Sequence, residues 1–439
     1  MKYYSTNGKA PVADLKKAVV KGLAEDKGLY MPETIKTLPT EFYNDISSMS
    51  FRDIAYNVAS AFFGEDVDGD ALQDIVYDTL SFDCPVVKVT DNIYSLELFH
   101  GPTLAFKDVG ARFMARLLRY FTQSTRNNRK TQGNLINVLV ATSGDTGSAV
   151  ANGFLGVEGI HVYVLYPKGK VSPIQECQFT TLGKNITAIE VDGVFDDCQA
   201  LVKSAFMDKE LNAHMKLTSA NSINVARFLP QAFYYFYAYA QMKKNANGKP
   251  IVFCVPSGNF GNICAGLFAK RMGLPIERFI AANNANSVFY EYLQTGEYQP
   301  RPSIQTIANA MDVGDPSNFA RVYDLYNKEY DAICADISGA TYTDDQIGET
   351  MCEVYRQTGY VCDPHGACGY RALAEGLKDG EMGVFLETAH PAKFKTTVDE
   401  ILGTDIEIPA KLQAFMQGEK QSVPMSKDFK DFKAYLMSK

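Results

Sequence analysis

The hydrophobic pattern of this sequence changes character near residue 134. Before that point, apolar residues recur at helical spacing over 10–23 and 51–63, with a turn-rich stretch between them. Pro85 then disfavours helix in the residue before it, which marks the end of this unit. We therefore expect a mostly helical N-terminal unit over residues 1–88.

From residue 134 onward, short and nearly continuous apolar runs alternate with helix-like segments. Runs of this kind are typical of strands buried on both faces of a parallel sheet. Strands are expected at 135–140, 161–166, 186–191, near Leu217, and at 251–255, 279–282 and 383–386. Helices are expected from Thr146, Pro173 and Asn262, over 195–207, and after Pro391. The alternation predicts an α/β protein with two doubly wound open sheets.

The gap between the two series of strands predicts a division of the chain into three domains. We expect a helical domain at 1–88, a larger α/β domain made of 89–129 and 222–439, and a smaller α/β domain at 130–221. The length of 439 residues agrees with this division, at ~150 residues for a typical domain.

The end of the chain shows one more helical stripe. Phe429, Phe432 and Leu436 have helical spacing within 426–439. We expect this stripe to dock on the body of the protein, and the less favoured interpretation is a helix that binds a partner.

Composition and charge narrow the function classes. The formal net charge of −8 disfavours nucleic acid or an anionic membrane as the main partner. No apolar run approaches the ~18 residues of a membrane span, and the first residues resemble neither a secretory signal nor a transit peptide. The nine cysteines are scattered, as expected for reduced thiols in a cytoplasmic protein.

Several familiar catalytic motifs are absent. The sequence has no GxGxxG, no Walker A loop, no HExxH and no GxSxG, which disfavours a nicotinamide dehydrogenase, a P-loop kinase and an α/β-hydrolase. Cys362, His365 and Cys368 form the one cluster that resembles a metal site. A second pair of ligands is missing, so we expect no metal.

Two glycine-bearing turns each follow a buried strand and precede a helix. The first spans 142–147 (TSGDTG) and the second spans 257–262 (SGNFGN). Turns of this kind aim backbone N–H groups and a helix N-terminus at one point, which favours a phosphate or a carboxylate. The alternative is that either turn is an ordinary strand-to-helix connection.

Lys107 is the candidate nucleophile. It follows the apolar stretch 99–106 and precedes a helix, so both the helix dipole and apolar surroundings favour its neutral amine. A neutral lysine amine is the form that makes a Schiff base. Position alone also fits an ordinary lysine on a first helical turn.

Thr388 lies at the end of a late strand, where open α/β sheets bind ligands. Its hydroxyl could bond a ring nitrogen without protonating it. Read in isolation, Thr388 is more often a helix cap before Pro391.

Together these segments resemble the threonine synthases of the longer bacterial and fungal type, which are pyridoxal-phosphate enzymes of the tryptophan-synthase-β-like group (fold type II). The resemblance covers nearly the whole chain, and it is weakest over about 320–345 and the last twenty or so residues. The matching strings are AVVKGLAEDKGLYMPE (18–33), LELFHGPTLAFKD (96–108), ATSGDTGSAV (141–150), LYPKGKVSPIQE (165–176), SANSIN (219–224), VPSGNFGN (255–262), NAMDVGDPSN (309–318), DPHGACGYRAL (363–373) and ETAHPAKFK (387–395).

The resemblance implies a pyridoxal 5′-phosphate site built around Lys107. That lysine would form a Schiff base with the cofactor and later shuttle protons. Phe106 would pack near the ring, Thr388 would face the pyridine nitrogen, and Asn224 or Asn221 would meet the ring's O3′. The cofactor phosphate would lie on the second turn, whose implied contributors are Gly258, Asn259, Phe260, Gly261 and Asn262.

The resemblance also implies a substrate site. The first turn would receive the substrate carboxylate through Thr142, Ser143, Gly144, Asp145 and Thr146, with Asn221 beside it. Cations for the substrate phosphate would come from the matched strings or next to them, with Arg227 and Arg112 favoured over Lys168, Lys170 and Lys395 because guanidinium binds phosphate bidentately. His100 is a further candidate, as a proton carrier.

The implied reaction converts O-phospho-L-homoserine and water into L-threonine and phosphate, the last step of threonine biosynthesis. Phosphate leaves by γ-elimination and water then adds at Cβ. The open alternatives are another lyase of the same fold type, such as a serine/threonine dehydratase or an amino-alcohol phospholyase, and an inactive relative that serves as a binding protein. The expected partner is this small molecule, with no nucleic acid and no membrane, in a monomer or homodimer.

Overall fold

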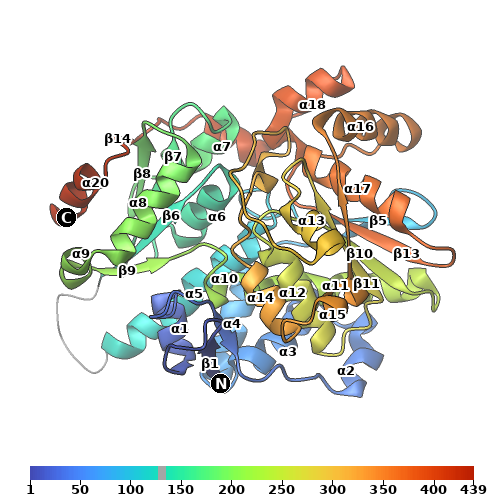
Figure 1. Cartoon of the computed structure of the whole chain (residues 1–439), viewed down its shortest axis with the longest axis horizontal. Helices are drawn as coiled ribbons and strands as arrows, with labels where there is room; N and C mark the ends of the chain where they lie inside the picture. Colours follow the sequence, from blue (N-terminus) through green and yellow to red (C-terminus); the bar gives the residue numbers. More distant parts are fainter. Residues whose placement is uncertain (127–134) are drawn as a thin grey trace.

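The computed structural model describes residues 1–126 and 135–439, which form two open β-sheets side by side above a mostly helical N-terminal layer (Figure 1). The two-sheet α/β fold and the helical N-terminal layer expected from the sequence are both confirmed. Among the described residues, no helix combines the length and the apolarity needed to cross a membrane.

The smaller sheet is parallel throughout and has the strand order β14-β8-β7-β6-β9. Its strands are β6 (Ile136–Ala141), β7 (Ile160–Pro167), β8 (Ile186–Val191), β9 (Lys216–Ser219) and β14 (Val423–Met425). All six residues of β6 are buried, as the apolar run predicts. Its helices are α6 (Asp145–Phe154), α7 (Pro173–Thr180), α8 (Phe195–Met207) and α9 (Lys209–His214).

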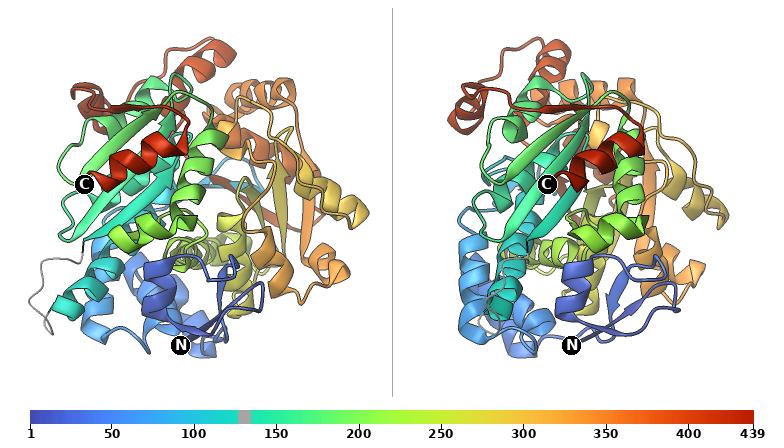
Figure 2. Two further views of the ribbon diagram at one scale, coloured as in Figure 1. Left: turned by 60° about the vertical axis from the view of Figure 1, so that its left-hand side comes forward. Right: turned by 90° about the vertical axis from the view of Figure 1, so that its left-hand side faces the viewer.

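The chain returns to this smaller sheet at its end. β14 forms its edge, although its residues fall within the range 222–439 that the sequence division assigns to the larger unit. Helix α20 (Phe429–Met437) then lies across the sheet (Figure 2) and buries Phe432 and Leu436. The expectation that this stripe docks on the body is confirmed.

The larger sheet has the order β12-β11-β10-β13-β5-β4, with only β4 antiparallel. Its strands are β4 (Val86–Lys88), β5 (Ile93–Glu97), β10 (Ile251–Pro256), β11 (Arg278–Asn283), β12 (Ile337–Thr341) and β13 (Met382–Glu387). The helices of this part are α11 (Ala232–Ala246), α12 (Gly261–Arg271), α13 (Val288–Thr295), α14 (Phe319–Leu325), α15 (Tyr330–Asp336), α16 (Asp344–Thr358), α17 (Pro364–Gly376), α18 (Lys395–Leu402) and α19 (Ala410–Met416).

The N-terminal layer contains a small antiparallel sheet that the sequence pattern did not predict. It is made of β1 (Lys2–Ser5), β2 (Ala13–Asp14) and β3 (Tyr30–Pro32). The helices of the layer are α1 (Leu15–Lys21), α2 (Thr40–Asp45), α3 (Phe51–Phe63) and α4 (Gly69–Thr79). Helix α3 packs on α11, where the rings of Phe51 and Tyr237 stack with centroids 4.4 Å apart.

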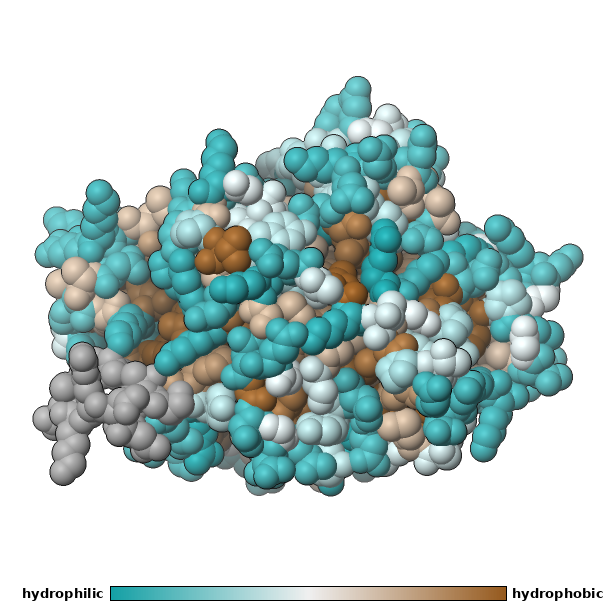
Figure 3. All heavy atoms as spheres, turned by 90° about the horizontal axis from the view of Figure 1, so that it is seen from below, coloured by the Kyte–Doolittle hydropathy of each residue, from teal (hydrophilic) through white to brown (hydrophobic). Residues whose placement is uncertain are grey.

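The remaining helical segments are one long helix and several short ones. The long helix is α5 (Lys107–Arg126), and the short segments are α10 (Val225–Phe228) and the 3-10 turns η1 (Ile46–Ser48), η2 (Leu229–Gln231), η3 (Asn309–Met311) and η4 (Pro391–Phe394). Seen from below, hydrophobic residues emerge as separate small groups between hydrophilic ones (Figure 3), as is normal for a folded protein in water.

Candidate active site

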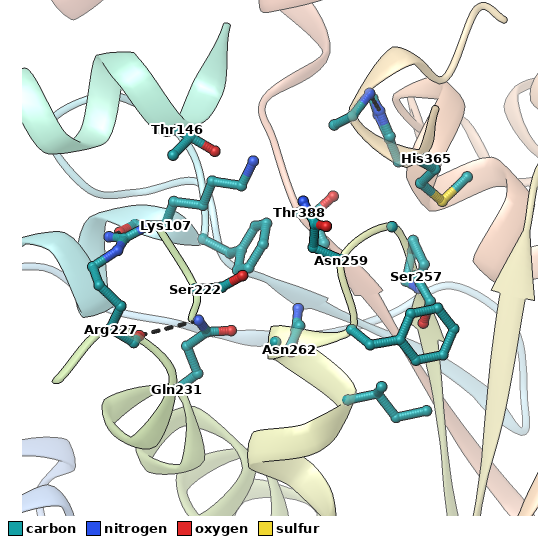
Figure 4. Close-up of a pocket in the computed structure, with 18 of the residues that line it drawn as sticks. Lys107, Thr146, Ser222, Arg227, Gln231, Ser257, Asn259, Asn262, His365 and Thr388 are labelled. Carbon is teal, nitrogen blue, oxygen red and sulfur yellow. Dashed lines mark hydrogen bonds between the residues drawn. The ribbon is translucent and has the colours of Figure 1, made fainter. Parts of the chain in front are cut away.

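A pocket lies between the two sheets, at the carboxyl ends of their parallel strands (Figure 4). This is the edge where open α/β sheets bind ligands. Its walls come from segments far apart in the sequence: Phe106 and Lys107, Thr146, Asn221 and Ser222, Arg227, Gln231, the turn from Pro256 to Ile263, Ala310 and Met311, His365, and Thr388.

Lys107 is the first residue of α5 and reaches into the pocket (Figure 4). The loop before it is tight. The side chain of Asp108 accepts hydrogen bonds from the backbone N–H and the hydroxyl of Thr103, at 2.9 and 2.6 Å. The N–H of Phe106 donates to the Thr388 carbonyl at 2.8 Å, so the lysine loop and the end of β13 are held together.

The amine of Lys107 is poised near neutral pH. Burial lowers the pKa of Lys107 to about 8, and the nearby charges of Arg227 and Lys393 act in the same direction. The carboxylate of Asp145 partly opposes them by favouring the charged amine. A useful fraction of this lysine is therefore neutral at physiological pH, which nucleophilic and acid–base chemistry both require.

The second turn runs from β10 into α12 and lines the pocket. Phe260 adopts a left-handed backbone with φ of 65°, which a non-glycine residue rarely does. A Cβ on Gly258 would lie 2.5 Å from the Ala310 carbonyl oxygen, so only glycine fits there. The turn places the N-terminus of α12, with N–H groups that have no preceding helical turn to bond, at the pocket.

Asn262 presents an unpaired donor at this helix start. Its Oδ1 accepts from the hydroxyls of Tyr234 and Tyr235, both at 2.7 Å, which fixes the orientation of the amide. The Nδ2 group is buried and has no partner within the described part of the chain. A buried donor without an acceptor is costly, so this position calls for an anionic ligand such as a phosphate.

The two tyrosines were not predicted to have a role at the site. Their helix, α11, reads in sequence as a buried aromatic segment with no ligand function, and both side chains are indeed fully buried. Their hydroxyls act on the pocket through Asn262. The spacing of aromatic residues carries no signal for that contact.

Thr388 and Phe106 both line the pocket, and a backbone hydrogen bond joins their segments. Thr388 is 7% exposed and lines the pocket (Figure 4). The alternative role as a helix cap does not apply, because the side chain that caps η4 is that of His390.

The first turn is held by its own side chains, and only Thr146 of this turn lines the pocket. The hydroxyl oxygen of Thr142 accepts from the N–H groups of Gly144 and Gly147, at 2.9 and 2.8 Å. Gly144 has a φ of 147° and lies against Gln175. Ser143 is partly exposed, and Asp145 is engaged in an ion pair described below. These four residues shape the turn around Thr146.

Of the two favoured arginines, only Arg227 lies at the pocket. It is 2% exposed, its Nη1 donates to the Lys107 carbonyl at 3.2 Å, and its Nε has no partner among the described residues. Arg112 does not meet the expectation. Its guanidinium donates to the carbonyls of Asp78 and Thr79, and these hydrogen bonds join α5 to the end of α4.

Three further expectations are corrected by the structure. Asn224 is fully buried, caps α10 and donates to the Val19 carbonyl at 2.9 Å, so it does not line the pocket; Asn221 does. His100 is held by Glu97 outside the pocket lining. Lys395 forms surface ion pairs on α18.

His365 lines the pocket in place of His100. Its Nδ1 lies 3.0 Å from Asp363 Oδ1, and its Nε2 accepts from the Ala310 N–H at 3.1 Å. The ring therefore supports the η3 loop that covers Gly258. The sequence signal for this position is the string DPHG, which is typical of a helix start: Asp363 caps α17 and Pro364 is its first residue.

A pair of buried carboxyl groups lies behind Thr388. Glu387 and Asp363 are both fully buried, and Glu387 Oε1 accepts from the Asp363 N–H at 2.5 Å. Each residue has one further carboxyl oxygen with no partner in the part of the chain described. Burial first, and the charge of Asp363 second, raise the pKa of Glu387 well above its ordinary value, so the pair retains a proton.

The substitution Glu387→Gln tests this protonation. A carboxyl whose pKa is raised by folding contributes stability below its ordinary pKa of 4.5, and that contribution is lost as pH rises through the folded value. Glutamine has no proton to lose. We expect the variant to gain at least about 1 kcal/mol over the parent at pH 8 and nothing at pH 4, because one pKa unit is worth about 1.4 kcal/mol. Chemical denaturation at both pH values measures the free energy of unfolding. A gain in stability that does not depend on pH would contradict the assignment.

The chain matches known protein families along nearly its whole length. Three family models match in succession: "Threonine synthase N terminus" at residues 2–80, "Pyridoxal-phosphate dependent enzyme" at 85–387, and "Threonine synthase, C-terminal" at 366–436. The threonine synthase of Haemophilus influenzae is 44% identical over 421 residues, which cover 96% of each chain.

Solved structures agree over the full length. The crystal structure of threonine synthase from Escherichia coli superimposes with a TM-score of 0.92 at 40% identity, covering 100% of both chains. The structure of pyridoxal-phosphate-bound threonine synthase from Brucella melitensis gives a TM-score of 0.91 at 35% identity, covering 100% of this chain and 99% of that one.

Proposed function

The chain belongs to the threonine synthase family of pyridoxal-phosphate-dependent enzymes, and we propose that the pocket around Lys107 is its active site. It is accordingly a pyridoxal-phosphate-dependent lyase, which converts O-phospho-L-homoserine and water into L-threonine and phosphate. The single observation that supports the site best is the meeting of the Lys107 amine with the unpaired donor of Asn262 in one pocket.

The pocket fits the cofactor from both ends. When bound, pyridoxal phosphate supplies an electron sink that stabilises carbanions at the substrate carbons. Lys107 would be the amine to which it attaches, and the start of α12, with Asn262 Nδ2, would hold its phosphate. Phe106 and Thr388 line the same pocket and would hold the ring, with the Thr388 hydroxyl available to its nitrogen.

Lys107 also handles the protons of the reaction. Protons must be taken from Cα and from Cβ of the substrate, and they must be returned after phosphate leaves Cγ and water adds at Cβ. An amine with a pKa of about 8 can both accept and donate near neutral pH. Because His365 is committed to Asp363 and Ala310, we assign these transfers to Lys107.

The substrate's two anionic groups have separate recognition elements. Its carboxylate lies at Thr146, at the N-terminus of α6, where the helix favours negative charge. Its phosphate is recognised by Arg227, whose unpaired Nε is available for an anion.

The function is tested by two assays on the purified holoenzyme. Phosphate and threonine should be released in equal amounts from O-phospho-L-homoserine. Ammonia release from L-threonine should be far slower, which separates this activity from that of a dehydratase. The opposite preference would overturn the function.

Replacing Arg227 by alanine should raise KM for O-phospho-L-homoserine about 30-fold, because loss of charge-assisted hydrogen bonds to phosphate costs about 2 kcal/mol. The visible absorbance of the bound cofactor should remain. Arg112→Ala is the matched control: it should lower the melting temperature through loss of its bonds to α4 and leave KM unchanged. An unchanged KM in Arg227→Ala removes Arg227 from the substrate site.

The division into domains and the setting of the enzyme are proposals of the same kind. We propose three units at 1–88, 89–129 with 222–439, and 130–221, except that the end of the chain, with β14 and α20, belongs to the smaller unit. The pocket lies between the last two units. All nine cysteines are free thiols, which supports a reducing cytoplasmic setting. The net charge of −8 disfavours binding to nucleic acid. Light scattering would distinguish a monomer from a homodimer.

A further inference from the structure

A buried ion pair joins two segments, one that follows a strand of the larger sheet and one that follows a strand of the smaller sheet. Lys393 lies in η4, after β13, and Asp145 begins α6, after β6. The ammonium nitrogen is 2.6 Å from Asp145 Oδ1, and the two side chains are 0% and 5% exposed. Charges this deeply buried are costly unless they are paired and hydrogen-bonded, so the pair needs an explanation.

The surroundings satisfy both partners. Lys393 Nζ also donates to the Thr103 carbonyl at 2.8 Å, and Gln175 Nε2 donates to Asp145 Oδ1 at 2.9 Å. The hydroxyl of Ser172 donates to the Lys393 carbonyl at 3.3 Å. The pair is therefore the centre of a network that joins η4, α6, α7 and the loop that leads to Lys107.

The network lies next to the reacting amine. Thr103 is four residues before Lys107, and Thr146, directly after Asp145, lines the same pocket as Lys107. Among charged groups, those that act on the Lys107 amine are Asp145 from α6, Lys393 from η4 and Arg227 from α10. Asp108, the neighbour of Lys107 on α5, is engaged by Thr103.

The effects of the two partners on Lys107 are opposite. Asp145 raises the pKa of Lys107 and Lys393 lowers it. Asp145 stays ionised: burial raises its pKa, but Lys393 and then Lys107 outweigh burial and hold the value at about 2. With both partners present the two effects on Lys107 oppose each other, and the effect of Asp145 is the larger.

We propose that Asp145 and Lys393 are a charge-balancing pair of positioning residues, which sets the proton affinity of the Lys107 amine while holding the Thr146 turn against the Lys107 loop. The proposal rests on the assignment of Lys107 as the reacting amine. Neither partner lines the pocket, so each acts through Lys107 and Thr146.

The test measures the titration of Lys107 in the full-length, cofactor-free chain. The protein is pulse-labelled with an amine-reactive acetylating reagent at pH values from about 5 to 11, a range that spans the lysine titration. The acetylated fraction of the Lys107 peptide is then measured by mass spectrometry. The variants are Asp145→Asn, Lys393→Met and the double variant. Lys395→Met is the matched control, since that lysine pairs with Asp399 and Asp405 at the surface.

The two single variants should shift Lys107 in opposite directions. Asp145→Asn leaves Lys393 without a counter-charge and should move the midpoint down by about one pH unit, whereas Lys393→Met should move it up by about one unit. The double variant and Lys395→Met should stay within about half a unit of the parent. Shifts of the same sign in the two single variants, or no shift in either, would overturn the proposal.

The double variant guards against loss of folding. It buries no unpaired charge, so it should fold even if a single variant does not. A double variant that is unfolded, or is folded with Lys107 displaced by a full unit, contradicts the charge-balancing role. Labelling of the cofactor-free chain does not depend on turnover. If the proposed function failed in the phosphate-release assay, the titration result would therefore still stand on its own.

Discussion

Replacing Lys107 by alanine is expected to reduce the release of phosphate from O-phospho-L-homoserine by at least about 10³-fold, because one amine supplies both the attachment point and the proton transfers. The visible absorbance of bound cofactor should also be lost from the purified protein. The geometry supports an effect of this size, since the described pocket lining contains no second lysine.

The control for this variant is Lys168→Ala. Lys168 lies in an exposed loop after β7, outside the pocket lining, and its loss should change neither absorbance nor turnover. Thermal melting of both proteins would confirm that they fold. If Lys107→Ala retained a tenth of the parent's activity, another group would have to perform the proton transfers, and the assignment of roles in the pocket would be wrong.

Substituting aspartate for Asn262 should weaken the binding of pyridoxal phosphate about 100-fold. The aspartate can still accept from Tyr234 and Tyr235 through one oxygen, but its other oxygen replaces the buried Nδ2 donor with a negative charge. A lost charge-assisted hydrogen bond together with repulsion of the phosphate costs about 3 kcal/mol. Equilibrium dialysis followed by absorbance measures the dissociation constant.

The tyrosines allow a finer test of the same contact. In the double variant Tyr234→Phe/Tyr235→Phe, the amide of Asn262 is no longer held in one orientation, and we expect about a tenfold loss of cofactor affinity. Asn327→Asp, at an exposed position, controls for the added charge. Cofactor binding within threefold of the parent in Asn262→Asp would show that the phosphate lies elsewhere.

The strands that the sequence predicts well are those with continuous apolar runs. β6 and β10 are buried at every position and β7 at all but one, so hydrophobicity alone marks them. β5 and β12 were not predicted, because polar residues and glycine interrupt their apolar residues. These are Ser95 and Glu97 in β5 (IYSLE) and Gly339 in β12 (ISGAT). These strands are stabilised by their neighbours in the sheet, and a sequence pattern does not contain that information.

The site shows a similar limit. Lys107, Thr146 and Thr388 lie beside strand ends or a helix start, and topology brings such positions together, so their presence in the pocket could be expected from the chain order. Two of the corrections concern side chains whose partners are distant in sequence. Arg112 finds the carbonyls of α4 and Asn224 finds Val19, contacts that depend on packing between elements. The same applies to the unpredicted contact of His365 with Ala310.

The position of β13 in the larger sheet has a consequence for how the protein is made. Residues 382–387 lie between β10 and β5, so that Gly383 pairs with both Val252 and Ile93. On the ribosome, β5 emerges long before the strand that joins it to the rest of the sheet. The sheet that carries Lys107 and Thr388 can therefore close only after synthesis has passed residue 387, and the smaller sheet gains its edge strand β14 later still. Folding of the larger sheet and completion of the smaller one should be late and largely post-translational, a period in which unpaired strand edges depend on protection from aggregation.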